Sequence, residues 1–278
     1  MRSVVPTAHI HPTVRQPVRG DASWRFPEAA PTGAPVLPEP VCRWTFQEAT
    51  GEMRWSDGAE RYALKEMAGE VARVEDGVMG PYSAELREGQ WFNLPRAECP
   101  ALNFGGAGAT FSVVAWVKRQ PKSNHECQAV AGMWNETVAT RQYCLFIDLS
   151  IWDSMEQACG HVSATGAPTP GYKYCMEAAI GATRLKMGEW QQVAFTFDGV
   201  WARVFVDGKM DYRPGLNPYY WPHVINDGGP AGSDFTVGAV YRGGSMGNWF
   251  TGRLGGLAVY REALSEEAVA WLHAARKA

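Results

Sequence analysis

Residue types that can move a proton are gathered between residues 159 and 175. His161 lies in Cys159-Gly160-His161-Val162-Ser163, and Tyr172 and Tyr174 lie in Tyr172-Lys173-Tyr174-Cys175. Histidine and tyrosine can serve as general acids or bases, and an arginine such as Arg141 can neutralise a developing negative charge. These four residues are the candidate catalytic set if the protein is an enzyme. The alternative is that His161 is an ordinary hydrogen-bonded histidine in a strand.

Aromatic side chains offer a second kind of chemistry, the stacking of rings against the C–H faces of sugars. They occur in a long loop at 219–221, after a Gly-rich stretch at 248–250, and on both sides of an expected strand at 143–149. Neighbouring polar side chains would bind the sugar hydroxyls. The candidate ligand-binding residues are Trp134, Trp152, Asp153, Tyr219, Tyr220, Trp221, Asn248 and Trp249. The alternative is that most of these rings fill the core, because aromatic side chains are usually buried.

Short strands joined by turns must position these residues. Alternating or continuous apolar runs predict strands at 42–46, 111–117, 143–149, 192–197, 202–206, 235–240 and 254–260. Asp198-Gly199 and Asp207-Gly208 predict two hairpin turns, because both residue types tolerate a positive φ. Ser265 is a good N-cap for one C-terminal helix, which should dock on a sheet edge. Strands without intervening helices predict an all-β, antiparallel two-sheet sandwich.

The first forty residues differ from the rest of the chain. Prolines recur there without a sustained hydrophobic period, at Pro6, Pro12, Pro17, Pro27, Pro31, Pro35, Pro38 and Pro40. Such a segment cannot form a helix or a central strand. We therefore expect an extended N-terminal arm over residues 1–40, docked through Trp24 and Phe26, and one domain over residues 41–278. An arm of this kind could join the subunits of a homo-oligomer.

Composition excludes several classes of partner. A net charge of −3 and a pI near 6.1 argue against a nucleic-acid partner, which requires a concentrated basic surface. No stretch approaches the roughly 20 apolar residues of a membrane span.

The first residues contain no apolar signal region, so a cytoplasmic location is expected. The six cysteines are expected to be free thiols there, although Cys127/Cys144 and Cys159/Cys175 could close loops in an oxidising compartment.

Four segments resemble one family. The segment 188–199 resembles the "G-x-W-x-x-V-A-x-T-x-D-G" strand of laminin-G-like domains, and the next strand, 202–209 with Val206-Asp207-Gly208-Lys209, resembles their "Y-V-D-G-K" hairpin. The strand at 111–118 and the closing segment at 252–267 are also similar to that family. The chain thus resembles the laminin-G-like, concanavalin A-like lectin/glucanase jelly-roll superfamily over about residues 42–275, in the right order.

The resemblance implies a carbohydrate ligand. It favours a lectin-like domain that binds a glycan in a concave groove. A carbohydrate-active enzyme, either a lyase or a glycoside hydrolase, and a structural or assembly protein are the alternatives. The family's glucanases carry Glu-x-Asp-x-x-Glu on one strand, which we do not find here. The nearest pair, Asp148 and Asp153, has an odd separation and would face opposite sides of a regular strand.

Calcium is in doubt because of a departure from the family pattern. Gly255-Gly256 stands where the family usually has Asp-Glu, and those acidic residues often support a calcium site or a salt bridge. Asp57 and Asp76 could supply oxygen ligands, but both precede glycine and are typical of ordinary turns. No cofactor is therefore expected.

Overall fold

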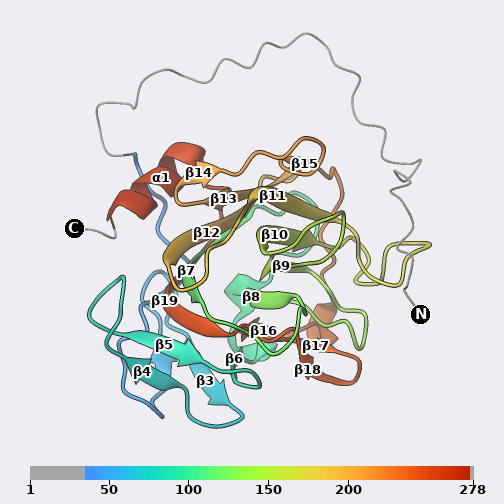
Figure 1. Cartoon of the computed structure of the whole chain (residues 1–278). Coiled ribbons are helices and arrows are strands. Elements are labelled where there is room, and N and C mark those ends of the chain that lie inside the picture. Colours follow the sequence, from blue (N-terminus) through green and yellow to red (C-terminus); the bar gives the residue numbers. More distant parts are fainter. Residues whose placement is uncertain (1–34, 276–278) are drawn as a thin grey trace.

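Residues 35–275, which the computed structural model describes, form two large antiparallel sheets stacked face to face, with one helix near the C-terminal end (Figure 1). The predicted all-β, antiparallel sandwich with one short C-terminal helix is confirmed. Residues 1–34, and with them most of the expected N-terminal arm, lie outside the described residues. The described part of that arm, residues 35–40, forms no helix or strand.

The first sheet has nine strands. Its order is β14–β13–β12–β7–β19–β5–β4, and β1 pairs in addition with β19 while β15 pairs with β13. The strands are β1 (Cys42–Trp44), β4 (Ala72–Val74), β5 (Ser83–Leu86), β7 (Phe111–Arg119), β12 (Trp190–Phe197), β13 (Trp201–Val206), β14 (Lys209–Met210), β15 (Tyr219–Tyr220) and β19 (Gly252–Tyr260).

The second sheet has eight strands in the order β11–β10–β9–β8–β16–β6–β3–β2. They are β2 (Arg54–Trp55), β3 (Ala63–Met67), β6 (Trp91–Leu94), β8 (Gln128–Met133), β9 (Tyr143–Ile147), β10 (Gln157–Val162), β11 (Ala178–Arg184) and β16 (Phe235–Val237). A separate hairpin joins β17 (Val240–Arg242) and β18 (Ser245–Gly247), and 3₁₀ turns span Arg96–Glu98, Pro100–Leu102 and Gly229–Ala231.

The two Asp-Gly turns lie where the sequence predicts them. Strands β12 and β13 pair antiparallel around Asp198-Gly199, and β13 pairs with β14 around Asp207-Gly208. Asp207 and Gly208 have φ of 49° and 83°, the left-handed conformation that a tight hairpin turn requires. The two predicted hairpin turns are therefore confirmed.

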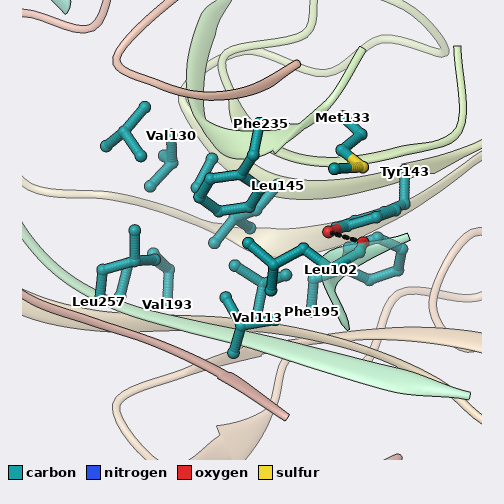
Figure 2. Packing of buried hydrophobic residues seen from close by; sticks show 14 of the residues in the cluster. Leu102, Val113, Val130, Met133, Tyr143, Leu145, Val193, Phe195, Phe235 and Leu257 are labelled. Atoms are coloured by element: carbon teal, nitrogen blue, oxygen red, sulfur yellow. Dashed lines mark hydrogen bonds between the residues drawn. The ribbon is translucent and has the colours of Figure 1, made fainter. Parts of the chain in front are cut away.

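The core fills the space between the sheets with aliphatic and aromatic side chains (Figure 2). The hydroxyl of Tyr143, a polar group within this core, donates a 2.9 Å hydrogen bond to the carbonyl oxygen of Leu102. Gly160 of β10 faces the first sheet, and a Cβ there would lie 2.2 Å from the ring of Phe195. A side chain at this position would push the two sheets apart.

Helix α1 (Glu266–Ala275) covers the outer face of the first sheet, the face directed away from the core. Its N-cap is as predicted: the Ser265 hydroxyl accepts a 3.2 Å hydrogen bond from the backbone N–H of Ala268. The helix packs Val269 against a cluster that includes Trp116 and Phe205. It therefore docks on a sheet face beside edge strand β14, rather than on an edge alone.

Three predicted strands end earlier than expected. The strand from Cys42 stops at Trp44 and does not reach Phe46, which has φ 56°. The strand from Tyr143 stops at Ile147, because Asp148 and Ser150 adopt φ near +60° and turn the chain away. The strand from Phe235 stops at Val237, where Gly238, with φ 87°, redirects the chain into hairpin β17–β18. The ends at Ile147 and Val237 supply loops to the outer face of the second sheet. Among the described residues, no helix has the length and apolar character needed to cross a bilayer.

Candidate functional site

Small side chains on the outer face of the second sheet leave room for a cavity. Because side chains alternate along a strand, Ala158 and Val162 of β10 enter the core while Cys159 and His161 face outward. His161 pairs with Cys144 on β9 and with Ala178 on β11, both of which are small. This outer face forms the floor of the cavity, and loops at both ends of the strands surround it.

The resulting cavity has a volume of about 530 Å³. This is within the range of roughly 300–1,000 Å³ that small-molecule sites occupy. It is lined by Asn124, His125, Glu126, Cys127, Trp134, Glu136, Leu149, Ser150, Ile151, His161, Tyr174, Cys175, Arg242 and Asn248. The lining mixes aromatic rings with side chains that form hydrogen bonds, and this mixture suits a ligand with both apolar and polar faces.

His161 is held in one orientation. Its Nδ1 lies 3.1 Å from the backbone carbonyl oxygen of Glu177, and its ring packs between Trp134, with centroids 4.8 Å apart, and Phe146, at 5.5 Å. A carbonyl can only accept, so the proton of the neutral ring must be on Nδ1. The other ring nitrogen, Nε2, therefore carries the lone pair and is a hydrogen-bond acceptor.

Burial keeps this ring neutral. His161 is only 3% exposed, and loss of solvation lowers its pKa to about 3, although the hydrogen bond to Glu177 acts in the opposite direction. The nearby guanidinium of Arg141 adds to the lowering. His161 is thus a constant acceptor at neutral pH and a weak base.

A charged cluster closes one side of the cavity. Arg242 forms an ion pair with Glu126, and the same guanidinium nitrogen donates to the Asn248 side-chain oxygen at 2.5 Å. Lys122 lies 3.5 Å from Glu126 as well. The positive charge of Arg242 is therefore already balanced by a neighbouring carboxylate.

Glu136, which carries the second carboxylate in the lining, also has hydrogen-bonding and charged partners. Glu136 accepts a 3.1 Å hydrogen bond from the Trp134 indole nitrogen, and its other oxygen lies 3.7 Å from the guanidinium of Arg141. Arg141 is buried, stacks 5.9 Å from the Trp134 ring, and donates a 2.9 Å hydrogen bond to the carbonyl oxygen of Gly166. Each charged side chain in this pair of clusters thus has an opposite charge beside it.

The structure brings four of the sequence-predicted site residues into the cavity lining: Trp134, His161, Tyr174 and Asn248. Arg141 lies directly behind Trp134. Tyr172 packs against Trp152 with ring centroids 6.1 Å apart, and neither ring is among the lining side chains.

The remaining predicted site residues lie away from the cavity lining. Asp153 is exposed in the loop after β9, where its backbone carbonyl accepts from Arg213 at 3.3 Å. Tyr219 and Tyr220 form β15 in the first sheet, and Trp221 is buried in the core against Phe197 at 5.6 Å. Trp249 is half-buried and does not line the cavity.

Three charged lining residues had no individual signal in the sequence. Glu126 and Glu136 belong to different loops and Arg242 ends β17, and isolated charged residues at such positions are common. They meet because β8 pairs with β9 and because hairpin β17–β18 lies along β8. Two backbone hydrogen bonds of 2.8 Å hold the hairpin region there. The Glu136 N–H donates one to the Tyr241 carbonyl, and the Ala129 N–H donates the other to the Asn248 carbonyl. This pairing is visible only in the tertiary structure.

The two carboxylates considered for calcium are both ion-paired. Asp57 lies 2.8 Å from Arg43, and Asp76 lies 2.9 Å from Lys118 and also pairs with Arg253. Within residues 35–275 no group of three or more His, Cys, Asp or Glu side chains is arranged to hold a metal ion. The absence of a cofactor stays a prediction from the sequence.

The cysteines near the cavity are all free thiols. Cys127 and Cys175 line it, and Cys144 and Cys159 belong to its floor. Burial raises the pKa of the Cys127 thiol to about 12, and the carboxylate of Glu136 adds to that rise. These side chains are therefore protonated at neutral pH and act as small apolar groups.

Comparison with known proteins identifies a family model that matches more than half of this chain. A family model, Laminin_G_3, described as the concanavalin A-like lectin/glucanases superfamily, matches residues 90–270. This span includes all four segments on which the sequence resemblance rests. A search of curated protein sequences found no significant match.

Several solved structures share the fold at low sequence identity. Domain 4 of AbnA, a GH43 extracellular arabinanase from Geobacillus stearothermophilus, in complex with arabinotriose, is 16% identical with a TM-score of 0.55, over 84% of this chain and 98% of that one. The binding domain of botulinum neurotoxin serotype G is 11% identical with a TM-score of 0.57, over 86% and 51% of the two chains. A Trypanosoma rangeli sialidase is 15% identical with a TM-score of 0.52, over 88% and 33%. The chain thus spans about half of the neurotoxin domain and a third of the sialidase.

Proposed function

This chain belongs to the concanavalin A-like lectin/glucanase superfamily, and on that premise we propose that it binds a neutral carbohydrate in the cavity on the outer face of the second sheet. The observation that carries the proposal is the composition of the cavity wall. Tyr174 offers an exposed ring for stacking, His161 offers a fixed acceptor, and the polar side chains around them can exchange hydrogen bonds with sugar hydroxyls.

The ion pairs favour a neutral sugar over an acidic one. Arg242 is the cation in the lining; its charge is balanced by Glu126, and the nitrogen that pairs with Glu126 also donates to Asn248. A uronate or sialate carboxylate would have to compete with Glu126 for Arg242, and would also lie near the carboxylate of Glu136. Sugar hydroxyls meet no such competition, because they donate to carboxylates and accept from guanidinium groups.

Structural relatives support the sugar-binding part of the proposal. The AbnA domain was solved with arabinotriose bound, and the sialidase with a difluorosialic acid. The arabinanase domain is similar to this chain over nearly its whole length, and its ligand is neutral. Arabinotriose is therefore the first ligand to test.

The geometry favours binding over acid–base catalysis by the predicted catalytic set. His161 is a poor base, because its pKa is about 3 and its Nδ1 is held by the Glu177 carbonyl. Tyr172 lies against Trp152 rather than in the cavity lining, and Arg141 is turned toward Gly166 and Glu136. An eliminase reaction needs a competent base and an uncommitted cation in one cleft. The assembly alternative depends on the N-terminal arm, most of which lies outside the described residues.

A matched pair of tyrosine variants tests the proposal. Both Tyr174 and Tyr212 are exposed, at 40% and 59%, but only Tyr174 lines the cavity. The full chain is screened on an array of neutral and acidic glycans and then titrated calorimetrically with arabinotriose and with the strongest array ligand. We expect Tyr174→Ala to weaken binding of the strongest ligand about tenfold, equivalent to about 1.4 kcal/mol, and Tyr212→Ala to leave it unchanged. Absence of binding to every neutral glycan would overturn the proposal.

A second assay addresses catalysis. Incubation of the protein with uronate-containing polysaccharides should release no unsaturated product that absorbs in the ultraviolet. Appearance of such a product, abolished in His161→Gln, would replace the binding function with a lyase activity.

A further inference from the structure

The walls of the cavity determine which part of a sugar chain can enter it. Strand β8, which forms part of the floor, has six residues and is therefore about 20 Å long. A groove along such a floor would accept the middle of a polysaccharide if both ends were open. Here both ends and both flanks are occupied by protein.

Loops close the cavity at the two ends of the strands. At the end where Gln128 pairs with Ile147, the lining comes from the loop that contains Glu126 and from Ile151. At the end where Met133 pairs with Tyr143, it comes from Trp134 and Glu136. A chain laid along β8 would meet side chains at either end.

Hairpin β17–β18 closes one flank along the length of β8. Tyr241 of the hairpin accepts a hydrogen bond from Glu136 in the loop after β8, and Asn248, directly after the hairpin, accepts one from Ala129 near the start of β8, each at 2.8 Å. The ion pair between Arg242 and Glu126 joins the hairpin to the loop before β8. Figure 1 shows the hairpin beside β8 and β16.

A junction between two loops closes the other flank. The indole nitrogen of Trp152, in the loop after β9, donates a 3.1 Å hydrogen bond to the backbone carbonyl of Met176, in the loop before β11. Tyr174 and Cys175, next to Met176, line the cavity. The Arg213 guanidinium donates to the carbonyl oxygen of Trp152 at 3.2 Å and fixes this loop from outside.

From this enclosure we infer that the cavity binds the terminal residues of a carbohydrate chain and excludes internal segments of a polysaccharide. The inference rests on the proposed carbohydrate-binding function. The terminal sugar enters through the mouth, its ring meets Tyr174, and its hydroxyls reach His161, while the rest of the chain extends into solvent. A ligand held in this way is recognised per chain end, whatever the length of the chain.

The dependence of affinity on chain length tests this inference. Linear arabino-, xylo-, cello- and malto-oligosaccharides of two to six units are titrated, together with the matching polymers at equal concentrations of chain ends. For the series that binds, we expect the Kd per chain to level off by three units and the polymer to bind no more tightly per end than the trimer. Affinity that rises more than fivefold from trimer to hexamer would overturn the inference and leave the proposed function standing. Failure of every series and of the glycan array would overturn both.

A pair of tryptophan variants tests the flank directly. Trp152→Ala removes the junction with Met176, whereas Trp55→Ala removes a 46% exposed ring on β2, the edge strand at the other end of the same sheet. Trp152→Ala should increase binding to the polymer at least fivefold relative to the trimer, and Trp55→Ala should not. An unchanged ratio in a folded Trp152→Ala protein would contradict the proposed role of this wall. If the variant does not fold, the length series on the natural sequence still decides the matter.

Discussion

The Nδ1 of His161 lies 3.1 Å from the backbone carbonyl oxygen of Glu177, and this contact fixes the orientation of a histidine on the cavity floor. The bond joins the end of β10 to the residue before β11. It determines which ring nitrogen carries the proton, and together with burial it makes the ring a neutral acceptor. The same relationship links the chemistry of the cavity to the stability of the fold.

The first prediction concerns the pH dependence of stability. The ordinary pKa of histidine is 6.5, whereas burial lowers the pKa of folded His161 to about 3. Below pH 6.5 the unfolded chain therefore binds one more proton at this site than the folded chain does. Stability should be complete above pH 6.5 and fall as the pH drops, with a slope from this residue of up to about 1.4 kcal/mol per pH unit.

Urea denaturation between pH 5 and 7.5 measures this slope. His161→Gln can still donate to the Glu177 carbonyl but cannot titrate, so its stability should change less over that interval. Carboxylates with lowered pKa values, such as Asp76, contribute mainly below pH 4 and do not obscure the effect. Equal slopes for the two proteins would show that His161 is accessible to protons in the folded state.

The second prediction compares two hairpin glycines. Gly199 and Gly208 both follow aspartate and have φ of 92° and 83°. A Cβ on Gly199 would lie no closer than 3.8 Å to another atom, whereas a Cβ on Gly208 would lie 2.9 Å from Ala270 Cα in helix α1. Gly199→Ala should cost about 1–2 kcal/mol of unfolding free energy from backbone strain alone. Gly208→Ala should cost at least about 1 kcal/mol more because the helix must move. Chemical denaturation of the two variants checks the difference, and equal losses would rule out the helix contact.

A third prediction concerns the packing between the two sheets. Gly160→Ala would place a methyl group 2.2 Å from the Phe195 ring, so the variant should be destabilised by about 1–3 kcal/mol. Phe195→Leu removes the ring edge and should relieve the clash. In a double-mutant cycle measured by urea denaturation, the losses should be less than additive. Additive losses would mean that the two positions do not touch.

The fourth prediction addresses the departure from the family pattern at Gly255. A Cβ there would lie 2.3 Å from Val78 Cγ1 and 3.0 Å from the Trp190 ring, because the loop that contains Val78 packs onto this face. Gly255→Asp, which restores an acidic residue, should lower the unfolding free energy by about 2 kcal/mol or more through overpacking and burial of a charge. Thermal unfolding in the presence and absence of calcium measures the effect, and Val78→Ala in the same background should recover part of the loss. A Gly255→Asp protein as stable as the natural one would show that the loop does not occupy this space.

The sequence by itself determined the architecture of this protein. Alternating runs such as 192–197 and 202–206, with Asp-Gly turns after them, carry a local signal, because side-chain alternation and positive φ depend on neighbouring residues only. The N-cap Ser265 carries the same kind of signal for the helix. Family motifs over most of the chain identified the superfamily, which the match over residues 90–270 confirms.

The site was only partly accessible from the sequence. Trp134, His161, Tyr174 and Asn248 have residue types that suggest a binding role, and the structure places them in one cavity. Trp221 has the same character, yet it fills the core against Phe197. Residue type alone does not distinguish a ring that lines a cavity from a ring that fills the core.

Only the tertiary structure decided which loops meet. Glu126 and Arg242 are 116 positions apart along the chain and form one ion pair, because hairpin β17–β18 folds along β8. Trp152 reaches Met176 because the strand from Tyr143 stops at Ile147 and the loop after it turns toward the loop before β11. Contacts of this kind depend on strand order and register, which arise from the packing of the whole sandwich and leave no local pattern in the chain. Each strand and helix therefore follows from residues that are neighbours in the sequence, whereas the cavity follows from the packing of the whole fold.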